Sequence, residues 1–184
     1  MNAQRLIRRA AMPAARRFTT PSPLVAYLTP WVAVVLASWV PLWPVIASAP
    51  LMPPFGFLML LAWRQLRPGL LPVWAGTLLG LFDDMVSGQP MGSAITLWSI
   101  TMLALDVIEA RFPWRNFLTE WIVAALMIVL YILAGVGIAN AAGGNTPPLV
   151  VVPQMVLSVL IYPLAGRLVA TLDRWRLRRY RVVG

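Results

Sequence analysis

Long apolar runs alternate with short polar turns along the whole chain, and this alternation is the clearest pattern in the sequence. A run of about 20 apolar residues is long enough to cross the hydrocarbon core of a bilayer as an α-helix. The pattern therefore predicts an all-α membrane protein, folded as a bundle of six transmembrane helices. The expected spans cover residues 24–40, 45–63, 70–86, 91–109, 117–139 and 149–170.

The second expected span, 45–63, contains Pro50, Pro53 and Pro54. Each proline removes a backbone N–H donor, and its ring obstructs a straight helix. Backbone groups that are freed inside lipid need cover from neighbouring protein. We therefore expect this span to be broken, and the sequence leaves open whether it crosses fully or re-enters.

All 15 basic residues are arginines, and they cluster at the ends of the apolar runs. With six spans, the arginines of both termini and of the turns at 64–67 and 111–115 fall on one side, which the positive-inside rule places in the cytoplasm. We therefore expect both termini to be cytoplasmic. The expected regions are a basic arm (1–23), a single membrane domain (24–170) and an arginine-rich tail (171–184).

The composition narrows the choice of partners and chemistry. The net charge of +9 fits contact with anionic lipid headgroups, and the sequence contains no nucleic-acid-binding motif. The N-terminal arm also has the composition of a transit peptide, but an arm that fixes topology is the favoured interpretation. Cysteine and histidine are absent, which excludes disulfides, thiolate or imidazole ligands and Ser-His-Asp catalysis. We expect no cofactor and no metal site, and the absence of these residues agrees with a non-enzymatic role.

One polar stretch, residues 80–92, interrupts the apolar pattern. It contains two of the six acidic residues side by side, Asp83 and Asp84. Charge at membrane depth costs about 2.5–3.5 kcal/mol per aspartate on insertion scales, so it usually marks a function or a buried partner. The candidate interaction residues, which form a small and polar helix face followed by a turn, are Gly76, Gly80, Asp83, Asp84, Ser87, Gly88, Pro90 and Gly92.

Several interpretations of this face remain open. Small residues let helices approach closely in lipid, so the face can pack against other helices of the same chain. It can equally be a docking face or a polar pocket, because internal packing does not require two carboxylates. Paired carboxylates also bind cations or act as acid and base, but the neighbouring sequence offers no further ligand. Finally, a carboxylate can cap the next helix together with Ser87 or Ser93.

Other polar residues within the spans are few. Asp106 and Glu109 end the fourth expected span beside the arginines of the next turn, where we expect interfacial ion pairs. One side of the sixth expected span carries polar residues that are either pocket residues or internally satisfied groups: Gln154, Ser158 and Tyr162.

A motif runs through the centre of the chain. The turn Arg67-Pro68 precedes an apolar helix, and a Gly-Leu-x-x-Asp stretch from Gly80 leads into Ser-Gly-x-Pro-x-Gly, which ends at Gly92. This pattern resembles the rod shape-determining protein MreD family, in which leucine is usual where Met91 stands. The motif covers the centre of the chain, whereas length, six spans and arginine-rich ends agree with the family over nearly all of it.

The resemblance implies a function that composition does not reveal. MreD-like proteins are inner-membrane components of the machinery that elongates the peptidoglycan wall of rod-shaped bacteria, and no enzymatic activity is attributed to them. They associate with MreC, and through it with a penicillin-binding transpeptidase, the RodA glycosyltransferase and the MreB filament. The implied fold is similar to that of the substrate-binding components of energy-coupling-factor transporters.

Two functions are therefore expected from different classes. The first is a non-enzymatic scaffold that presents a surface to the transmembrane helix of MreC and helps to maintain rod shape. The alternative is a vitamin-like small-molecule binder of an uptake transporter, which the similar fold and the Ala33/Ala37 spacing support. Against the alternative, the loop at 140–148 is short and has no charged or aromatic residue to hold a ligand.

Overall fold

The computed structural model describes residues 23–42, 51–111 and 116–177. These residues form six α-helices and two short 3-10 helices, without any strand, which confirms the prediction of an all-α protein. In chain order the elements are α2 (Pro23–Trp39), η1 (Val40–Leu42), α3 (Phe55–Leu66), α4 (Ala75–Ser87), α5 (Ser93–Arg111), α6 (Phe117–Ala141), η2 (Pro148–Val151) and α7 (Val152–Arg176).

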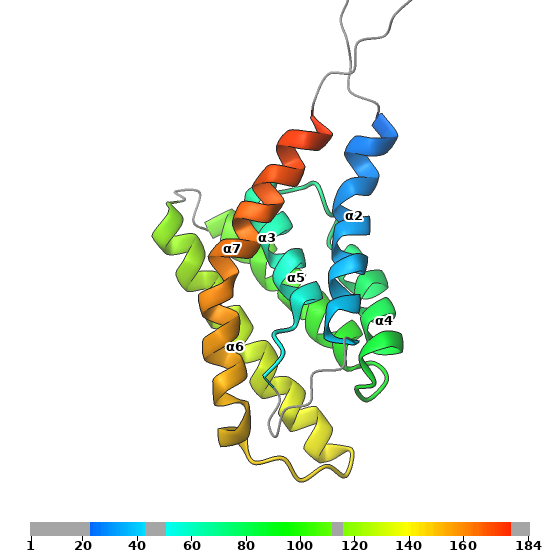
Figure 1. Ribbon diagram of the computed structural model, residues 1–184, viewed down its shortest axis with the longest axis vertical. Helices are drawn as coiled ribbons and strands as arrows, with labels where there is room; N and C mark the ends of the chain where they lie inside the picture. Colours follow the sequence, from blue (N-terminus) through cyan, green and yellow to red (C-terminus); the bar gives the residue numbers. More distant parts are fainter. Residues whose placement is uncertain (1–22, 43–50, 112–115, 178–184) are drawn as a thin grey trace, which may run out of the picture.

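The helices form an elongated bundle with α3 at its centre (Figure 1). Helix α3 packs against α2 and α7, while α4 and α5 form one antiparallel hairpin and α6 and α7 form another. The start of α2 and the end of α7 lie at the same end of the bundle (Figure 1). We call this the basic end, because Arg64, Arg67, Arg174 and Arg176 lie there, and we call the opposite end, with the α4–α5 turn, the motif end.

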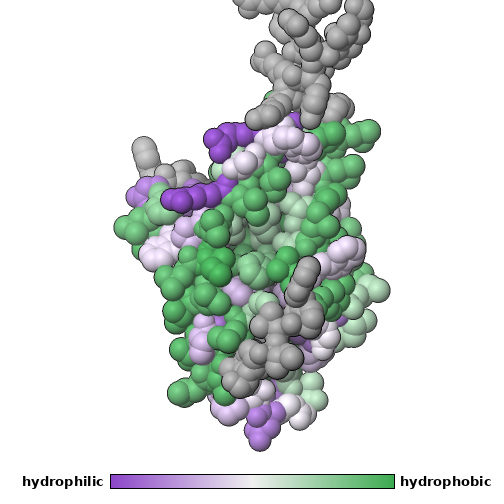
Figure 2. Space-filling view, in the orientation of Figure 1, coloured by the Kyte–Doolittle hydropathy of each residue, from purple (hydrophilic) through white to green (hydrophobic). Residues whose placement is uncertain are grey.

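The outer surface of the bundle is apolar. Large aliphatic side chains on α2, α5, α6 and α7 are exposed, and the space-filling view shows them as a broad hydrophobic surface with hydrophilic residues gathered near the ends (Figure 2). A soluble monomer rarely exposes apolar area on this scale. Within the described residues, four stretches are long and apolar enough to cross a membrane: Leu24–Leu42, Ser93–Arg111, Phe117–Ala141 and Pro148–Arg176.

Helices α3 and α4 are shorter, with 12 and 13 residues, than the roughly 20 that a full crossing needs. Helix α3 is nevertheless the core of the bundle, because every residue from Gly56 to Gln65 is buried. A helix that is apolar nearly all round lies either inside protein or inside lipid, and α3 lies inside protein. The second apolar run thus supplies the central helix, around which the longer helices pack.

The prolines set the start of α3. The expected span 45–63 is corrected: residues 51–54 have no regular structure, and the helix begins at Phe55, directly after Pro53-Pro54, and ends at Leu66. Residues 43–50 lie outside the described part. Proline has no N–H to donate and disfavours a helical conformation in the preceding residue, so the helix begins after the pair.

The third and sixth expected spans also have different bounds. Helix α4 begins at Ala75 rather than at 70, after a turn in which Gly69 adopts a positive φ of 81°. Helix α7 continues to Arg176, six residues beyond the expected end at 170. It continues because Asp173 and Arg176 have partners on other helices, as described below.

Prolines within α2 and α7 leave helix carbonyls without their usual donors, and neighbouring helices supply replacements. Pro30 cannot donate to the carbonyl of Ala26, which instead accepts a 2.6 Å hydrogen bond from Arg176 Nη1. An unsatisfied carbonyl inside lipid costs several kcal/mol, so each replacement bond also fastens two helices together.

Side chains of neighbouring helices also bond backbone carbonyls at two further positions. Pro163 in α7 frees the carbonyl of Val159, which accepts a 3.3 Å hydrogen bond from Trp121 Nε1 of α6. The carbonyl of Met52, beside the proline pair, accepts a 2.6 Å bond from Gln154 Nε2 of α7. The expectation that neighbouring protein covers the backbone of the broken span is therefore met at Met52.

Candidate functional site

Asp84 caps the next helix. Its carboxylate is buried and accepts hydrogen bonds from the backbone N–H groups of Gly92 (2.9 Å), Ala94 (2.8 Å) and Ile95 (3.2 Å) and from the Ser93 hydroxyl (3.1 Å). The first N–H groups of a helix lack intrahelical partners, and a negative charge is favoured at the positive end of the helix dipole. The capping role suggested by the sequence is thus present, with Ser93 as the partner.

Asp83 points in a different direction from Asp84. Its side chain is buried and lies against α3, where a Cβ atom built on Gly56 would be 3.2 Å from Asp83 Oδ1 and in collision with Ser38 of α2. The two carboxylates diverge because helix α4 continues to Ser87 and successive residues differ by about 100° around a helix. Among the described residues, no group of three or more histidine, cysteine or acidic side chains could hold a metal ion.

Gly76 and Gly80 lie at the contact between α4 and α5 within the hairpin. A Cβ atom at Gly76 would lie 2.9 Å from the Trp98 carbonyl oxygen, and one at Gly80 would lie 2.7 Å from the Ala94 carbonyl oxygen. Only glycine allows the backbones of α4 and α5 to approach so closely. This part of the candidate face therefore packs against α5 of the same chain.

The remaining candidate residues form the turn at the motif end. Gly88 ends α4 with a left-handed φ of 67°, and Gly92 has a φ of 94°, conformations that favour glycine at both positions. The carbonyl of Pro90 accepts a 3.0 Å hydrogen bond from Ser93 N at the start of α5. Ser87 and Gly88 are exposed, so this turn is the part of the motif that a partner can reach.

At the basic end, Asp173 joins α7 to the turn between α3 and α4. Its Oδ2 accepts hydrogen bonds from Nε (3.0 Å) and Nη2 (2.7 Å) of Arg67, and its Oδ1 accepts a 2.8 Å bond from Arg176 Nε. The Arg176 guanidinium lies 5.4 Å from the ring centre of Trp63 and also bonds Ala26 of α2, as noted above. The hydrogen bond and charge of Asp173 raise the pKa of Arg67 above its usual value, so this arginine stays charged at physiological pH.

A second buried arginine joins α3 to α5. Arg64 Nη2 lies 2.7 Å from Asp106 Oδ1 and 3.0 Å from Glu109 Oε2. The sequence placed ion pairs at these two acids, but it associated them with the arginines of the turn at 111–115 and did not identify Arg64. Arg64 lies 42 residues before Asp106 in the chain, so only the folded bundle reveals this pairing.

The polar residues of the sixth expected span are internally satisfied. Gln154 Nε2 bonds the carbonyl of Met52, and Ser158 donates a 2.6 Å hydrogen bond to the Gln154 carbonyl. The Tyr162 hydroxyl donates a 2.8 Å bond to Gln65 Oε1 of α3. Gln154 and Tyr162 thus fasten α7 to the central helix and its preceding segment, whereas the Ser158 bond stays within α7.

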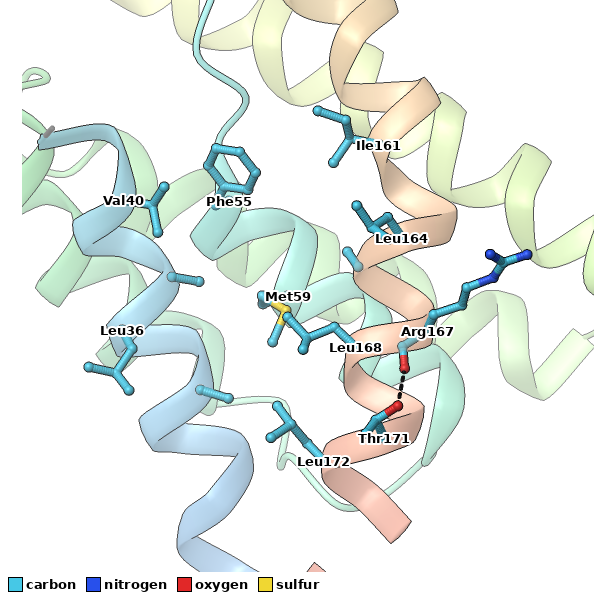
Figure 3. A pocket seen from close by; sticks show the side chains of 13 residues that line it. Leu36, Val40, Phe55, Met59, Ile161, Leu164, Arg167, Leu168, Thr171 and Leu172 are labelled. Atoms are coloured by element: carbon cyan, nitrogen blue, oxygen red, sulfur yellow. Dashed lines mark hydrogen bonds between the residues drawn. The ribbon is translucent and has the colours of Figure 1, made fainter. Parts of the chain in front are cut away.

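A lateral groove is a feature that the sequence pattern did not predict. The groove has a volume of about 670 Å³. Helices α2 and α7 form its two sides, and residues at the start of α3 line its base (Figure 3). Its walls are almost wholly apolar, and the Thr171 hydroxyl within it donates a 2.9 Å bond to the Arg167 carbonyl. The lining residues include Ala33, Leu36, Ala37, Val40, Phe55, Met59, Leu164 and Leu168.

The chain has one informative similarity to known proteins. A family model described as rod shape-determining protein MreD matches residues 24–170, which is well over half of the chain. No curated protein and no solved structure matches the chain significantly. The match covers the whole bundle from the start of α2 into α7 and includes every candidate residue of the motif.

Proposed function

The chain belongs to the MreD family of rod shape-determining proteins, and from this premise we propose that it is a non-enzymatic membrane scaffold of the peptidoglycan elongation machinery. Family membership supports a role in rod shape determination for a membrane protein. The finer proposal is that the bundle binds MreC, and through it the penicillin-binding transpeptidase, RodA and MreB. The family match over the full bundle is the observation that carries this proposal.

For the orientation, we propose an inner-membrane bundle that crosses six times with both termini in the cytoplasm. The clustering of arginines at the basic end supports this proposal, because cytoplasmic loops are enriched in arginine and lysine. The motif end then faces the outer side. Helices α3 and α4 are too short to cross alone, so the turns that flank them would complete each crossing. The surrounding helices cover α3 and would keep its flanking backbone away from lipid.

For the contact surface, two features support binding of a partner that has a single transmembrane helix. The lateral groove is apolar, opens on the flank of the bundle, and contains Ala33 and Ala37, whose small side chains would allow a second backbone to approach closely. The exposed turn at 87–92 would meet the outer segment that follows such a helix. In this proposal Gly76, Gly80 and Asp84 hold the hairpin that presents the turn.

A pull-down from native membranes in mild detergent tests the proposal. We expect MreC and the synthase pair to co-purify with the full chain, and Ala37→Phe to lower the recovery of MreC about tenfold by filling the groove. Val32→Phe is the matched control, because Val32 is exposed on the same helix but does not line the groove. Equal recovery with both variants would exclude the groove, whereas absence of MreC from the wild-type eluate would contradict the scaffold.

A vitamin-like binder remains the second candidate function, favoured by a cavity of about 190 Å³ at the motif end that Gln89, Tyr131 and Gln154 help to line. This cavity is smaller than the roughly 300–1,000 Å³ that enclose drug-sized ligands, which ranks the function second. Recovery of an ATP-driven energy-coupling module, or of a bound vitamin without a wall-synthesis partner, would reverse the order.

A further inference from the structure

A cavity of about 280 Å³ lies between α3, α6 and α7, on the other side of α7 from the lateral groove. We call it the α3–α6–α7 cavity. Unlike the groove, it combines polar and apolar walls. Its lining includes Gln65 and Leu66 from α3, Glu120 and Trp121 from α6, and Tyr162, Gly166 and Arg167 from α7.

Hydrogen bonds between helices fix the walls of this cavity. Tyr162 on α7 donates to Gln65 on α3, and Trp121 on α6 donates to the proline-freed carbonyl of Val159 on α7. Three helices are thus fastened around the space, which is therefore preformed. A preformed site lowers the ordering cost of binding.

The cavity also carries two opposite charges. The Arg167 side chain leaves α7 on the side away from the groove (Figure 3) and reaches the α3–α6–α7 cavity, whose wall Glu120 of α6 also forms. Among the residues that the structure describes, no carboxylate forms an ion pair with the Arg167 guanidinium. An arginine on a lipid-facing helix extends toward water or toward an anion.

In the orientation proposed above, on which this inference rests, this charge lies near the cytoplasmic surface of the membrane. Arg167 lies nine residues before Arg176, the last residue of α7, which is roughly 13 Å along the helix axis at about 1.5 Å per residue. Helix α6 begins at this level with Phe117, followed by Trp121, and aromatic rings of this kind favour the interface between lipid and water. In the proposed orientation, this is the level of the cytoplasmic phospholipid headgroups.

We propose that the α3–α6–α7 cavity binds the headgroup of a zwitterionic aminophospholipid, such as phosphatidylethanolamine. The phosphate oxygens accept charge-assisted hydrogen bonds from the Arg167 guanidinium, and the ammonium donates to the Glu120 carboxylate. The cavity encloses a headgroup rather than a whole lipid, so the acyl chains lie outside along the apolar flank. Two opposite charges at one cavity select a headgroup that carries both.

Native mass spectrometry of the full chain in detergent tests this site, with palmitoyl-oleoyl phosphatidylethanolamine, the matching phosphatidylglycerol or soluble phosphoethanolamine added in separate arms. We expect the wild-type chain to retain one phosphatidylethanolamine in preference to phosphatidylglycerol. Arg167→Gln should weaken this binding about tenfold, because a charge-assisted hydrogen bond is lost. Soluble phosphoethanolamine should bind more weakly than the lipid, because it lacks the acyl chains.

Two further variants separate a specific site from general basicity and from misfolding. Gly166→Leu should also remove the lipid, because a Cβ there meets no atom within 4 Å and the longer side chain would grow into the cavity. Arg174→Gln is the matched control, since Arg174 is exposed on the same helix but does not line the cavity. Thermal unfolding without added lipid shows whether each variant is folded.

The result that supports the proposal is loss of phosphatidylethanolamine with Arg167→Gln and Gly166→Leu but not with Arg174→Gln. Equal lipid retention by the wild-type chain and both cavity variants would overturn it. So would a wild-type preference for phosphatidylglycerol, an equal loss with Arg174→Gln, or phosphoethanolamine binding as tightly as the lipid.

Discussion

The two ends of the bundle both bury carboxylates, but they compensate the charge in different ways. At the basic end, Asp173 is surrounded by the guanidinium groups of Arg67 and Arg176. At the motif end, Asp84 has no cationic partner among the described residues and is surrounded by backbone N–H groups at the start of α5. One end is held by ion pairs between distant segments, and the other by a cap within one hairpin.

This difference suggests a division of tasks. At the basic end, the ion pair of Arg67 with Asp173 joins the α3–α4 turn to α7, and the hydrogen bond of Arg176 to the Ala26 carbonyl joins α7 to α2. These segments are far apart in the chain, so the contacts fix the global arrangement of the bundle. The cap at the motif end fixes only α4 against α5 and leaves the following turn exposed. A proposed partner-binding turn benefits from being held locally, because its shape is then independent of movements elsewhere.

The largest expected effect is at Asp173. Asp173→Asn removes the negative charge and leaves the Arg176 guanidinium, whose side chain is 6% exposed, without its counter-ion. Breaking a buried ion pair in this way costs about 3–5 kcal/mol, because the remaining charge stays desolvated. The free energy of unfolding, measured by titration with sodium dodecyl sulphate in mixed micelles, checks this value.

Asp106→Asn is the control for this prediction. The Asp106 side chain is 60% exposed, and its partner Arg64 also contacts Glu109, so the loss should stay below about 1 kcal/mol. If the two variants lost equal stability, burial would not distinguish the two ion pairs, and Asp173 would not be the dominant contact of the basic end.

How far the sequence predicts this structure depends on how many residues separate the interacting groups along the chain. Continuous apolar runs predicted the helices well; the expected fifth span at 117–139 agrees with α6 at Phe117–Ala141. The capping of α5 by Asp84 was also within reach, because donor and acceptor lie 8–11 residues apart in one motif. Local periodicity and local capping are properties of a short stretch of chain.

The remaining features depend on contacts between distant segments. Arg67 and Asp173 are 106 residues apart, and no periodicity in either segment reveals that they meet. The lateral groove likewise needs three helices to be placed together before its volume exists. The sequence predicted the small face of α4 as either a packing face or a docking face. The structure places Gly76 and Gly80 against α5. The sequence alone did not decide between the two, because only the fold specifies which helix lies beside α4.

A smaller effect is expected at Asp84. Asp84→Ala leaves the buried N–H groups at the start of α5 without their acceptor, and loss of charged hydrogen bonds of this kind costs about 3 kcal/mol at most. Because the cap is local, amide hydrogen exchange should increase in residues 84–96 and remain unchanged at the basic end. Faster exchange throughout the bundle would contradict the division between global and local fastening.

The smallest effect is expected at Gly80, and it tests how close the hairpin contact is. Gly80→Ala places a Cβ atom 2.7 Å from the Ala94 carbonyl oxygen, a backbone atom that cannot move aside without shifting α5. Overpacking of this kind typically costs about 1–3 kcal/mol, and the helix propensity gained by replacing glycine, about 1 kcal/mol, offsets part of it. Gly137→Ala in α6 is the matched control, because no atom lies within 4 Å of its Cβ position, and it should therefore be neutral or stabilising. If Gly80→Ala were as stable as Gly137→Ala in the same micelle titration, the α4–α5 contact would be loose, and the glycine face would be available to a partner after all.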